Sequence, residues 1–355
     1  MPLDFTKKIR EFLSNDIGID LGTANTLVYL RGHGIVINEP TVVAINQKTN
    51  RLVAIGSEAK AMLGRTPAHL IAIRPLVDGV ISDFEVTEEM LAYFIGKAEA
   101  RAKKVLGPRV VVGVPSGITN VEIRAVRDAA TSAGAREVYI IEEPMAAAIG
   151  VRLPVKSPVG SMIVDIGGGT TDIAVIALEG IVRAKNLRVA GDRMNSDISA
   201  YIRNEFKILI GEKTAEELKI AIGGVLPERE PLEAAIRGRD LITGLPREVI
   251  ITDTDVREAI APAVSEILDS TREVIEMTPP EILSDIVSRG VYLVGGGALL
   301  RHLPEFMSEA LNLPVHLAED PLTAVARGTG IILERLPEFE NVLIRNEDEI
   351  AFKHA

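Results

Sequence analysis

The sequence contains no cysteine, which excludes disulfide bonds and thiolate metal sites and suits a reducing cytoplasm. It also lacks tryptophan and has only 5 tyrosines, so aromatic side chains for a sugar pocket are scarce. The 39 basic residues are outnumbered by 50 acidic ones, which gives a net charge of −11. This charge argues against a broad nucleic-acid surface, so no nucleic-acid partner is expected. No apolar run approaches the ~18–20 residues of a transmembrane helix, and the N-terminus lacks the long apolar stretch of a signal peptide.

What is present indicates a soluble protein of two domains. Hydrophobic residues make up 47% and charged residues 25% of the chain, which is typical of globular proteins. At 355 residues the chain exceeds one ordinary core, so two domains of ~100–200 residues are expected.

The two expected domains are copies of one plan. The segment IGIDLGTANTLVYLRGHGIV (17–36) aligns with MIVDIGGGTTDIAVIALEGIV (162–182), placing Asp20 opposite Asp165 and Gly22 opposite Gly167. Both segments read as strand, glycine turn, strand. Further along, 110–116 matches 291–297, and 142–150 matches 319–328, in the same order. The repeat predicts a duplicated α/β domain in which strands alternate with helices around a mixed sheet.

Two stretches do not repeat and are interpreted as inserted subdomains, and a segment rich in proline and glycine (150–160) marks the domain boundary. We predict domain IA from 1–36, 77–150 and 325–355, and subdomain IB from 37–76. Domain IIA is predicted from 151–190 and 255–324, and subdomain IIB from 191–254.

The two glycine turns are typical of phosphate binding. Glycine lets the backbone approach an anion, and successive N–H groups form a concave nest for phosphate oxygens. Side chains able to add hydrogen bonds are Thr23, Asn25, Thr170 and Thr171. Neither turn contains the lysine of a Walker A loop. Asp20 and Asp165, near the ends of their strands, are candidates for Mg²⁺ beside a polyphosphate.

Other motifs admit two interpretations. Glu143 precedes a proline, so it either caps a helix or activates the water that attacks a terminal phosphate, with Glu142 as the alternative. The turn in LVGGGALL (293–300) is either a close strand–helix connection or a floor under a purine. In TAEELKIAIG (214–223), Glu216, Glu217 and Lys219 either reach a nucleoside or remain solvated.

The N-terminal segment has an amphipathic pattern. Its apolar residues follow helical spacing on one face, and Lys7, Lys8 and Arg10 lie on or beside the other. Such a helix either lies in a membrane interface or packs on its own domain. The apolar residues are Phe5, Ile9, Phe12 and Leu13.

Taken in order, the motifs DLGTAN, EEPMAAAIG, DIGGGTTD, VGGGALL and TAVARGTG resemble the phosphate hairpins, interdomain connectors and adenosine loop of the actin, Hsp70 and sugar-kinase ATPases. Over essentially the whole chain the sequence is most similar to the bacterial actin family MreB. The resemblance implies the actin-like ATPase fold, with duplicated ribonuclease-H-like domains flanking a nucleotide cleft. It further implies a cytoplasmic ATPase that uses ATP and Mg²⁺ and polymerises with itself. Its filaments would lie on the inner face of the cell membrane and organise cell-wall synthesis with wall-elongation and membrane proteins, which maintains rod shape.

The resemblance also assigns residues. Phosphates would be contacted by Gly22, Thr23, Ala24 and Asn25 from one side and by Gly167, Gly168, Gly169 and Thr170 from the other. Adenosine would be held by Glu216, Glu217, Leu218 and Lys219 and by Gly295, Gly296, Gly297 and Ala298. Glu143 would act in hydrolysis. The N-terminal helix and the apolar pair Val105 and Leu106 would contact the membrane. The lysine that actin carries just past its first phosphate turn is missing from TANTLVYL.

Three classes of function are compatible with a nucleotide cleft of this kind. A small-molecule kinase of the same superfamily is the alternative, but the lack of tryptophan counts against its sugar pocket. An Hsp70-like chaperone needs a substrate-binding domain after the ATPase core. The ATPase motifs extend over essentially the whole of this sequence, which counts against a chaperone. A nucleotide-gated polymer is therefore favoured.

Overall fold

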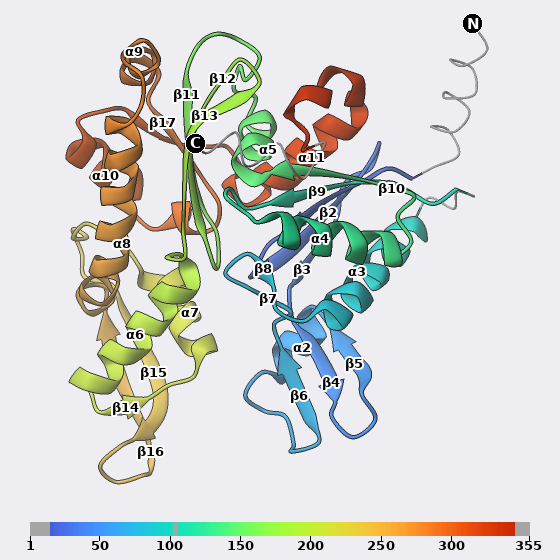
Figure 1. Cartoon of the computed structure of the whole chain (residues 1–355). Helices are drawn as coiled ribbons and strands as arrows, with labels where there is room; N and C mark the ends of the chain where they lie inside the picture. The colour runs from blue at the N-terminus through green and yellow to red at the C-terminus, as the bar shows by residue number, and fades with distance from the viewer. Residues whose placement is uncertain (1–14, 102–105, 345–355) are drawn as a thin grey trace, which may run out of the picture.

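The structure is a computed structural model that describes residues 15–101 and 106–344. Two halves lie side by side, each built on a five-stranded sheet (Figure 1). The first sheet has the order β10-β9-β1-β2-β3, with strands Glu137–Glu142, Arg109–Val114, Ile17–Leu21, Asn25–Leu30 and Gly34–Pro40. The second has the order β13-β12-β11-β17-β18, with strands Gly180–Leu187, Thr171–Ala177, Ser161–Ile166, Val291–Val294 and Val315–Leu317.

The two sheets share one topology. In each, the first three strands form an antiparallel meander, and the last two add in parallel on the other side of the first strand. The sequence prediction of a duplicated α/β domain with a mixed sheet is confirmed. Central strands β9 and β11 are buried along their whole length, which explains why their sequences are continuous apolar runs rather than alternating ones.

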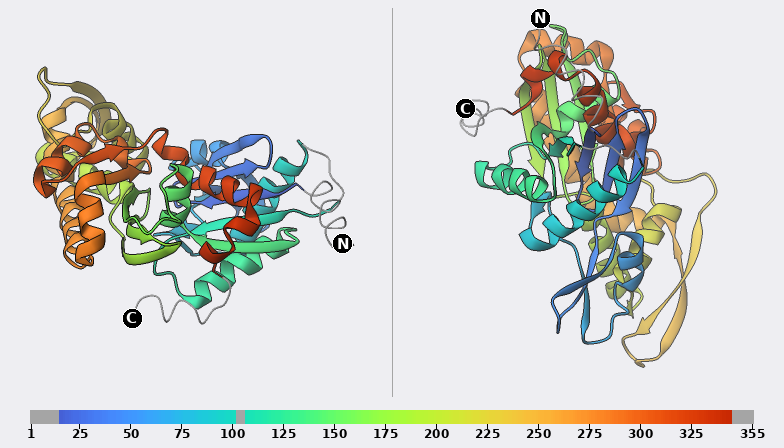
Figure 2. Two further views of the ribbon diagram at one scale, coloured as in Figure 1. Left: turned by 90° about the horizontal axis from the view of Figure 1, so that it is seen from above. Right: turned by 90° about the vertical axis from the view of Figure 1, so that its right-hand side faces the viewer.

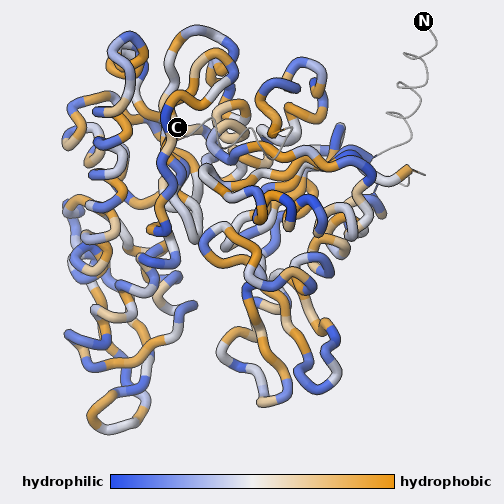
Figure 3. Tube along the Cα trace, viewed as in Figure 1, coloured by the Kyte–Doolittle hydropathy of each residue, from blue (hydrophilic) through white to orange (hydrophobic). Residues whose placement is uncertain are grey.

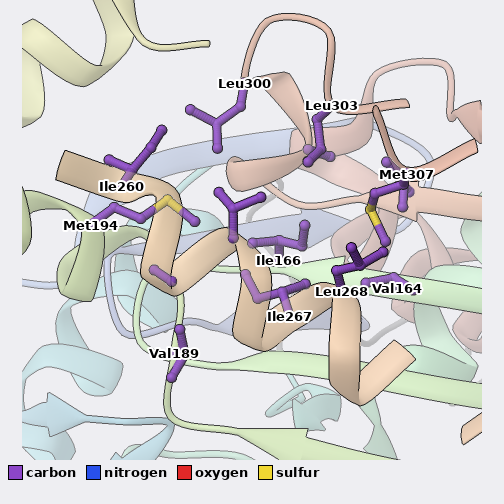
Figure 4. Packing of buried hydrophobic residues seen from close by; sticks show 14 of the residues in the cluster. Val164, Ile166, Val189, Met194, Ile260, Ile267, Leu268, Leu300, Leu303 and Met307 are labelled. Carbon is purple, nitrogen blue, oxygen red and sulfur yellow. The ribbon is translucent and has the colours of Figure 1, made fainter. Parts of the chain in front are cut away.

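Helices cover the outer faces of both sheets. Helices α3 (Phe84–Glu99) and α4 (Asn120–Ser132) pack on the first sheet, and α8 (Asp253–Glu276), α9 (Pro280–Arg289) and α10 (Leu303–Leu311) pack on the second. Hydrophobic residues follow the strands of both sheets (Figure 3). In the second half, Ile260 and Ile267 of α8 pack against Ile166 of β11, with Leu300 and Met307 closing the cluster (Figure 4).

Two helices, one after each sheet, cross between the halves with their backbones in close contact. Helix α5 (Glu143–Gly150) packs on β11 and β12 of the second sheet, although the sequence analysis placed it in domain IA, and α11 (Ala324–Glu334) packs on β1 and β9 of the first. A Cβ atom on Gly150 would lie 1.9 Å from the Ala324 carbonyl oxygen, and one on Gly328 would lie 1.8 Å from that of Ala146. The crossing therefore requires glycine at both positions.

Each half also carries a small subdomain, and both lie at the same end of the molecule (Figure 2). The first has a sheet of order β5-β4-β6 (Arg51–Ile55, Val43–Asn46, Leu70–Ile73) with α2 (Ser57–Met62). The second contains α6 (Gly191–Glu205), α7 (Glu212–Ile222) and the sheet β14-β15-β16 (Ile208–Leu209, Glu233–Asp240, Pro246–Thr252). The predicted boundary at residue 37 falls inside β3, because Asn38 and Pro40 still pair with Leu27 and Asn25 of β2.

Short elements complete the chain. A two-stranded ribbon, β7 (Leu76–Val77) with β8 (Val80–Ile81), follows the first subdomain, and the 3₁₀ helices are η1 (Gly297–Leu299), η2 (Pro321–Thr323), η3 (Leu336–Glu338) and η4 (Glu340–Val342). None of the helices in the described part of the chain is both long and apolar enough to cross a membrane.

Most of the residues proposed to contact a membrane cannot be placed. Phe5, Ile9, Phe12, Leu13 and Val105 lie outside the described residues. Leu106 is described and is half-buried.

Candidate functional site

A cavity of about 530 Å³ opens between the two halves, a volume typical of small-molecule sites. Both glycine turns line it, one from each sheet. The first turn contributes Gly22, Thr23, Ala24 and Asn25, and the second contributes Gly167, Gly168, Gly169 and Thr170. The eight residues that the family resemblance assigned to phosphate therefore come together at one site.

The two turns touch each other, which explains the run of glycines better than turn geometry alone. A Cβ atom on Gly168 would lie 2.5 Å from the Ala24 Cβ, and one on Gly169 would lie 2.7 Å from the Thr23 Oγ1. The Thr23 hydroxyl oxygen also accepts a 2.9 Å hydrogen bond from the backbone N–H of Gly79, between β7 and β8. Any side chain at 168 or 169 would push the two halves apart.

The threonine hydroxyls beside the two turns donate hydrogen bonds to different parts of the protein. The Thr41 hydroxyl donates to the Gly22 carbonyl oxygen over 2.6 Å and so fixes the first turn. The Thr171 hydroxyl donates to the Val189 carbonyl oxygen over 2.7 Å, and its side chain is fully buried. The expectation that Thr171 contacts phosphate is therefore wrong, because its hydroxyl proton is used within the second half. Thr170 does line the cavity.

Three carboxyl groups line the cavity beside the turns: Asp165 of β11, which is buried, and Asp20 of β1 and Glu143 of α5, which are half-buried. Burial raises the pKa of Asp20 to about 7. Burial, followed by the charges of neighbouring carboxylates, holds the pKa of Glu143 and of Asp165 well above its ordinary value. Such a cluster favours a bound cation, because a positive charge would offset both the desolvation and the repulsion.

Of the two candidate catalytic glutamates, only Glu143 lines the cavity. It is the first residue of α5, where Pro144 follows it as the sequence suggested, and Glu142 ends β10 as the N-cap residue without a side-chain capping bond. The neighbours of Glu143 are acidic: Asp172, Asp20 and Asp165 all raise its pKa. The position of Glu143 matches that of a group acting on a substrate in the cavity.

At the other end of the cavity lie residues expected to hold a nucleoside. Glu216 and Lys219 of α7 line it, together with Gly295, Gly296 and Gly297. Gly295 has a φ of +81°, and a Cβ there would lie 2.4 Å from the Asp165 Oδ1. This turn therefore needs glycine both for its backbone conformation and for its approach to Asp165.

Three residues of the same prediction turn away from the cavity. The side chains of Leu218 and Ala298 are buried in the hydrophobic core of the second half. Glu217 is exposed and lies 3.8 Å from the ammonium group of Lys213, one turn away on α7. Helical periodicity explains this, since residues 216 and 219 share a face that 217 and 218 do not.

The structure adds residues that sequence reasoning missed. Asp192 and Asn195 of α6 line the cavity, spaced three residues apart on one face of the helix. A helix beginning at the motif AGDRMN directly after the second hairpin meander was the signal that could have found them. The larger apolar residues that line the cavity are Leu21, Leu27, Ile220, Leu299, Leu300, Pro321, Leu322 and Val325.

Ion pairs connect the two inserted subdomains across the cavity mouth. The ammonium group of Lys60 lies 2.8 Å from a carboxylate oxygen of Glu216. The guanidinium of Arg74 lies 3.3 Å from Asp192 and 2.5 Å from Glu212. Because Glu216 and Asp192 also line the cavity, these ion pairs join the two subdomains directly beside the site.

Magnesium fits the donor set, provided that the substrate supplies further ligands. Within residues 15–101 and 106–344, no group of three or more histidine, aspartate or glutamate side chains could hold a metal ion alone. Mg²⁺ usually takes one or two protein carboxylates and keeps waters or substrate phosphates as its other ligands. Asp20 and Asp165 would be those carboxylates.

Comparison with known proteins gives consistent matches. A family model described as MreB/Mbl protein matches residues 14–341. The cell shape-determining protein MreB of Escherichia coli K12 is 51% identical over 334 residues, which cover 93% of this chain and 96% of that protein.

Comparison with solved structures points to the same family. MreB5 of Spiroplasma citri bound to ADP superposes with a TM-score of 0.88 at 39% identity, covering 92% of this chain and 98% of that one. The same protein bound to AMPPNP gives a TM-score of 0.86. MamK, solved as a double helical filament, gives 0.77 at 23% identity over 90% of this chain and 99% of its own, which shows the fold alone. The actin-like fold expected from the motifs is confirmed.

Proposed function

The chain belongs to the MreB/Mbl family, and from that premise we propose that it binds ATP with Mg²⁺ between its halves and polymerises into filaments. It is an actin-like cytoskeletal protein with a role in cell shape. The observation that carries the proposal is the cavity in which two glycine hairpins, one from each half, meet beside three carboxyl groups.

Phosphate binding follows from the turns. Backbone N–H groups at Gly168 and Gly169 and at Ala24 offer donors from opposite halves, and the hydroxyls of Thr23 and Thr170 add to them. Without a lysine in either turn, these dipoles bear the phosphate charge. A divalent cation beside Asp20 and Asp165 would supply the remaining positive charge.

Hydrolysis is assigned to Glu143. Its carboxyl group faces the cavity from the start of α5, where it can orient a water or accept its proton during attack on the terminal phosphate. Burial and the neighbouring carboxylates raise the pKa of Glu143. A cation bound beside Asp20 and Asp165 would offset that repulsion and favour the carboxylate form of Glu143, which is the form that acts as a base.

Polymerisation follows from closure. ATP contacts both halves and so fixes the angle between them, and the ion pairs of Lys60 and Arg74 hold the inserted subdomains together in that state. Head-to-tail stacking of a subunit in one fixed shape is a heterologous contact that does not close, and it yields filaments.

Membrane association is proposed from the sequence pattern of residues 1–13. The apolar face with Phe5, Ile9, Phe12 and Leu13 and the basic residues beside it suit an anionic inner membrane surface, where the filaments would meet wall-elongation proteins. Deleting residues 1–13 is expected to abolish co-sedimentation with anionic liposomes and to leave ATP affinity unchanged. Undiminished lipid binding after the deletion would contradict this part of the proposal.

The test of the nucleotide site is calorimetric titration with Mg·ATP, Mg·ADP and Mg·GTP, followed by phosphate-release measurements. Gly168→Val places a side chain where the two turns touch and is expected to abolish binding. Gly117→Ala, a loop glycine with open space around it, tests for non-specific damage, although its positive φ of 72° predicts a small loss of stability. Formation of ADP that rises steeply with a small hydroxyl compound, without matching release of free phosphate, would indicate a kinase instead.

A further inference from the structure

The carboxylate of Glu39 attaches the first inserted subdomain (β4, β5, β6 and α2) to the body of its half. Glu39 belongs to β3 of the five-stranded sheet, and its Oε2 atom accepts hydrogen bonds from Ser57, the first residue of α2. The backbone N–H of Ser57 donates over 3.0 Å and its hydroxyl over 2.6 Å. The Oε1 atom of Glu39 accepts a 3.2 Å bond from the ammonium group of Lys97 on α3. One side chain therefore links a strand and a helix of the body to the helix of the subdomain.

The first turn of α2 is built around this carboxylate. The N-cap residue is Gly56, which has no side chain to accept from the free N–H groups of the helix, and Glu39 supplies an acceptor from a distant strand. A Cβ atom on Gly56 would lie 2.7 Å from the Glu39 Oε2, so glycine leaves room for the carboxylate. Burial alone would raise the pKa of Glu39, but the hydrogen bonds from Ser57 and the charge of Lys97 lower it below its ordinary value, so the group is ionised at neutral pH.

The same helix reaches the other half of the molecule one turn later. Lys60 follows Ser57 by three residues, which places both on one side of α2. The backbone N–H of Lys60 donates to the Gly56 carbonyl oxygen over 2.8 Å, so its place is set by the turn that Glu39 holds. Its ammonium group pairs with Glu216 of α7, which lines the cavity from the second half. A path of bonded groups therefore runs from β3 to the far wall of the cavity.

Glu39 itself does not reach the cavity. Its neighbour Asn38 is among the residues that line it and Glu39 is not, as expected because successive side chains of a strand point to opposite faces of the sheet. The chain joins the subdomain to the body at two connections, 40–43 and 73–76. Two such connections form a hinge, and the bonds between Glu39 and Ser57 add a restraint on its rotation.

We propose that Glu39 is a positioning residue for nucleotide binding, which holds the first subdomain at the angle where Lys60 meets Glu216 and thereby supports closure over ATP from outside the cavity. This inference rests on the proposed binding of ATP. Loss of the carboxylate leaves the two phosphate turns and Glu143 in place, so it lowers the affinity for the nucleotide without removing the site.

The first measurement is the distance between the two inserted subdomains. Because the chain contains no cysteine, Val53→Cys in β5 and Ile242→Cys in the turn between β15 and β16, both at exposed positions, can carry spin labels for dipolar electron paramagnetic resonance. Labelled chains are diluted with unlabelled ones, so that distances between subunits do not contribute. With Mg·AMPPNP the otherwise unaltered protein should give a narrow distance distribution, and Glu39→Ala a broader one that extends to longer distances. Glu89→Ala, at an exposed glutamate of α3, is the control and should leave the distribution unchanged.

The second measurement asks whether Glu39 acts through Lys60. Calorimetry gives the affinity for Mg·ATP of the wild type, Glu39→Ala, Lys60→Ala and the double variant. Glu39→Ala should weaken binding about two- to fivefold and by no more than Lys60→Ala, and the double variant should bind as Lys60→Ala does. Glu39→Gln, which keeps the size and one acceptor oxygen, should give a smaller loss, and it carries the test if Glu39→Ala does not fold.

Two results would overturn the proposal. Distance distributions that are the same with and without the Glu39 carboxylate would show that it does not hold the subdomain. Losses of affinity that multiply in the double variant would show that Glu39 and Lys60 act independently. Failure of the wild type to bind any nucleotide would instead contradict the proposed function, and the distributions of the nucleotide-free proteins, again expected to be broader for Glu39→Ala, would still test the attachment.

Discussion

The crossing of α5 and α11 gives the sharpest prediction, because one added methyl group should act on both halves at once. At Gly328 a Cβ atom would lie 1.8 Å from the Ala146 carbonyl oxygen, whereas real Cβ atoms essentially never approach another atom within 3.0 Å. The neighbouring atom is backbone, so no side chain can rotate away. Gly328→Ala must therefore separate the two helices by about 1.2 Å, the difference between these distances.

Two opposing terms set the size of the effect. Replacing glycine by alanine inside a helix gains about 0.8–1 kcal/mol, whereas overpacking a buried contact costs about 1–3 kcal/mol or more. Because the clash involves backbone atoms, we expect the upper end of the cost and a net loss of about 2 kcal/mol in the free energy of unfolding. Gly150→Ala, with 1.9 Å to the Ala324 carbonyl oxygen, should lose a similar amount.

The matched control is Gly96→Ala in α3, where nothing lies within 4 Å of the added methyl group. It should gain up to about 1 kcal/mol, so the same substitution changes sign with position. Urea unfolding followed by circular dichroism measures all three variants, and calorimetry measures their ATP affinity, which should fall for the crossing variants alone. Crossing variants as stable as Gly96→Ala would show that the helices do not meet at these glycines.

Three further predictions concern charged groups in or near the cavity. Glu143→Ala should bind ATP but release phosphate at least ~100-fold more slowly in a coupled phosphate assay, and an unchanged rate would remove it from the reaction. Lys60→Ala removes the ion-pair partner of Glu216 and should weaken ATP binding about two- to fivefold relative to the wild type at low salt, and by less at high salt. If the variant and the wild type bind ATP equally well at both salt concentrations, the pair does not support closure. Burial raises the pKa of Asp172 from 3.8 to about 6, so its stabilising contribution is complete below about pH 3.8 and is lost as the pH rises through about 6. Urea unfolding of the nucleotide-free protein should show this decline, and Asp172→Asn should reduce it; an unchanged decline would assign it to other groups.

The sequence was sufficient for the parts of the site that repeat. Asp20 and Asp165, with the glycines after them, occupy equivalent places in two copies of one strand–turn–strand unit, and the shared topology of the two sheets brings both turns into one cavity. Local pattern therefore predicted which turn residues line the cavity, apart from Thr171; their contact with phosphate stays a prediction.

Of the residues predicted to hold a nucleoside, only some line the cavity, because lining depends on which face of a helix is turned toward it. A motif of four consecutive residues included Glu217 and Leu218, although a helix presents only one face to the cavity. The ion pair between Lys60 and Glu216 joins residues 156 apart in the chain, so no local sequence pattern could predict it. Asn195 was missed for a similar reason, since only its burial next to the cavity distinguishes it from an ordinary helical asparagine.

The most direct test of the account is electron microscopy of the purified full chain on an anionic lipid monolayer, with and without Mg·ATP. The account predicts filaments lying flat on the lipid when Mg·ATP is present and few or none without it. Discrete particles in both conditions, from protein that calorimetry shows to bind ATP, would contradict a nucleotide-gated polymer.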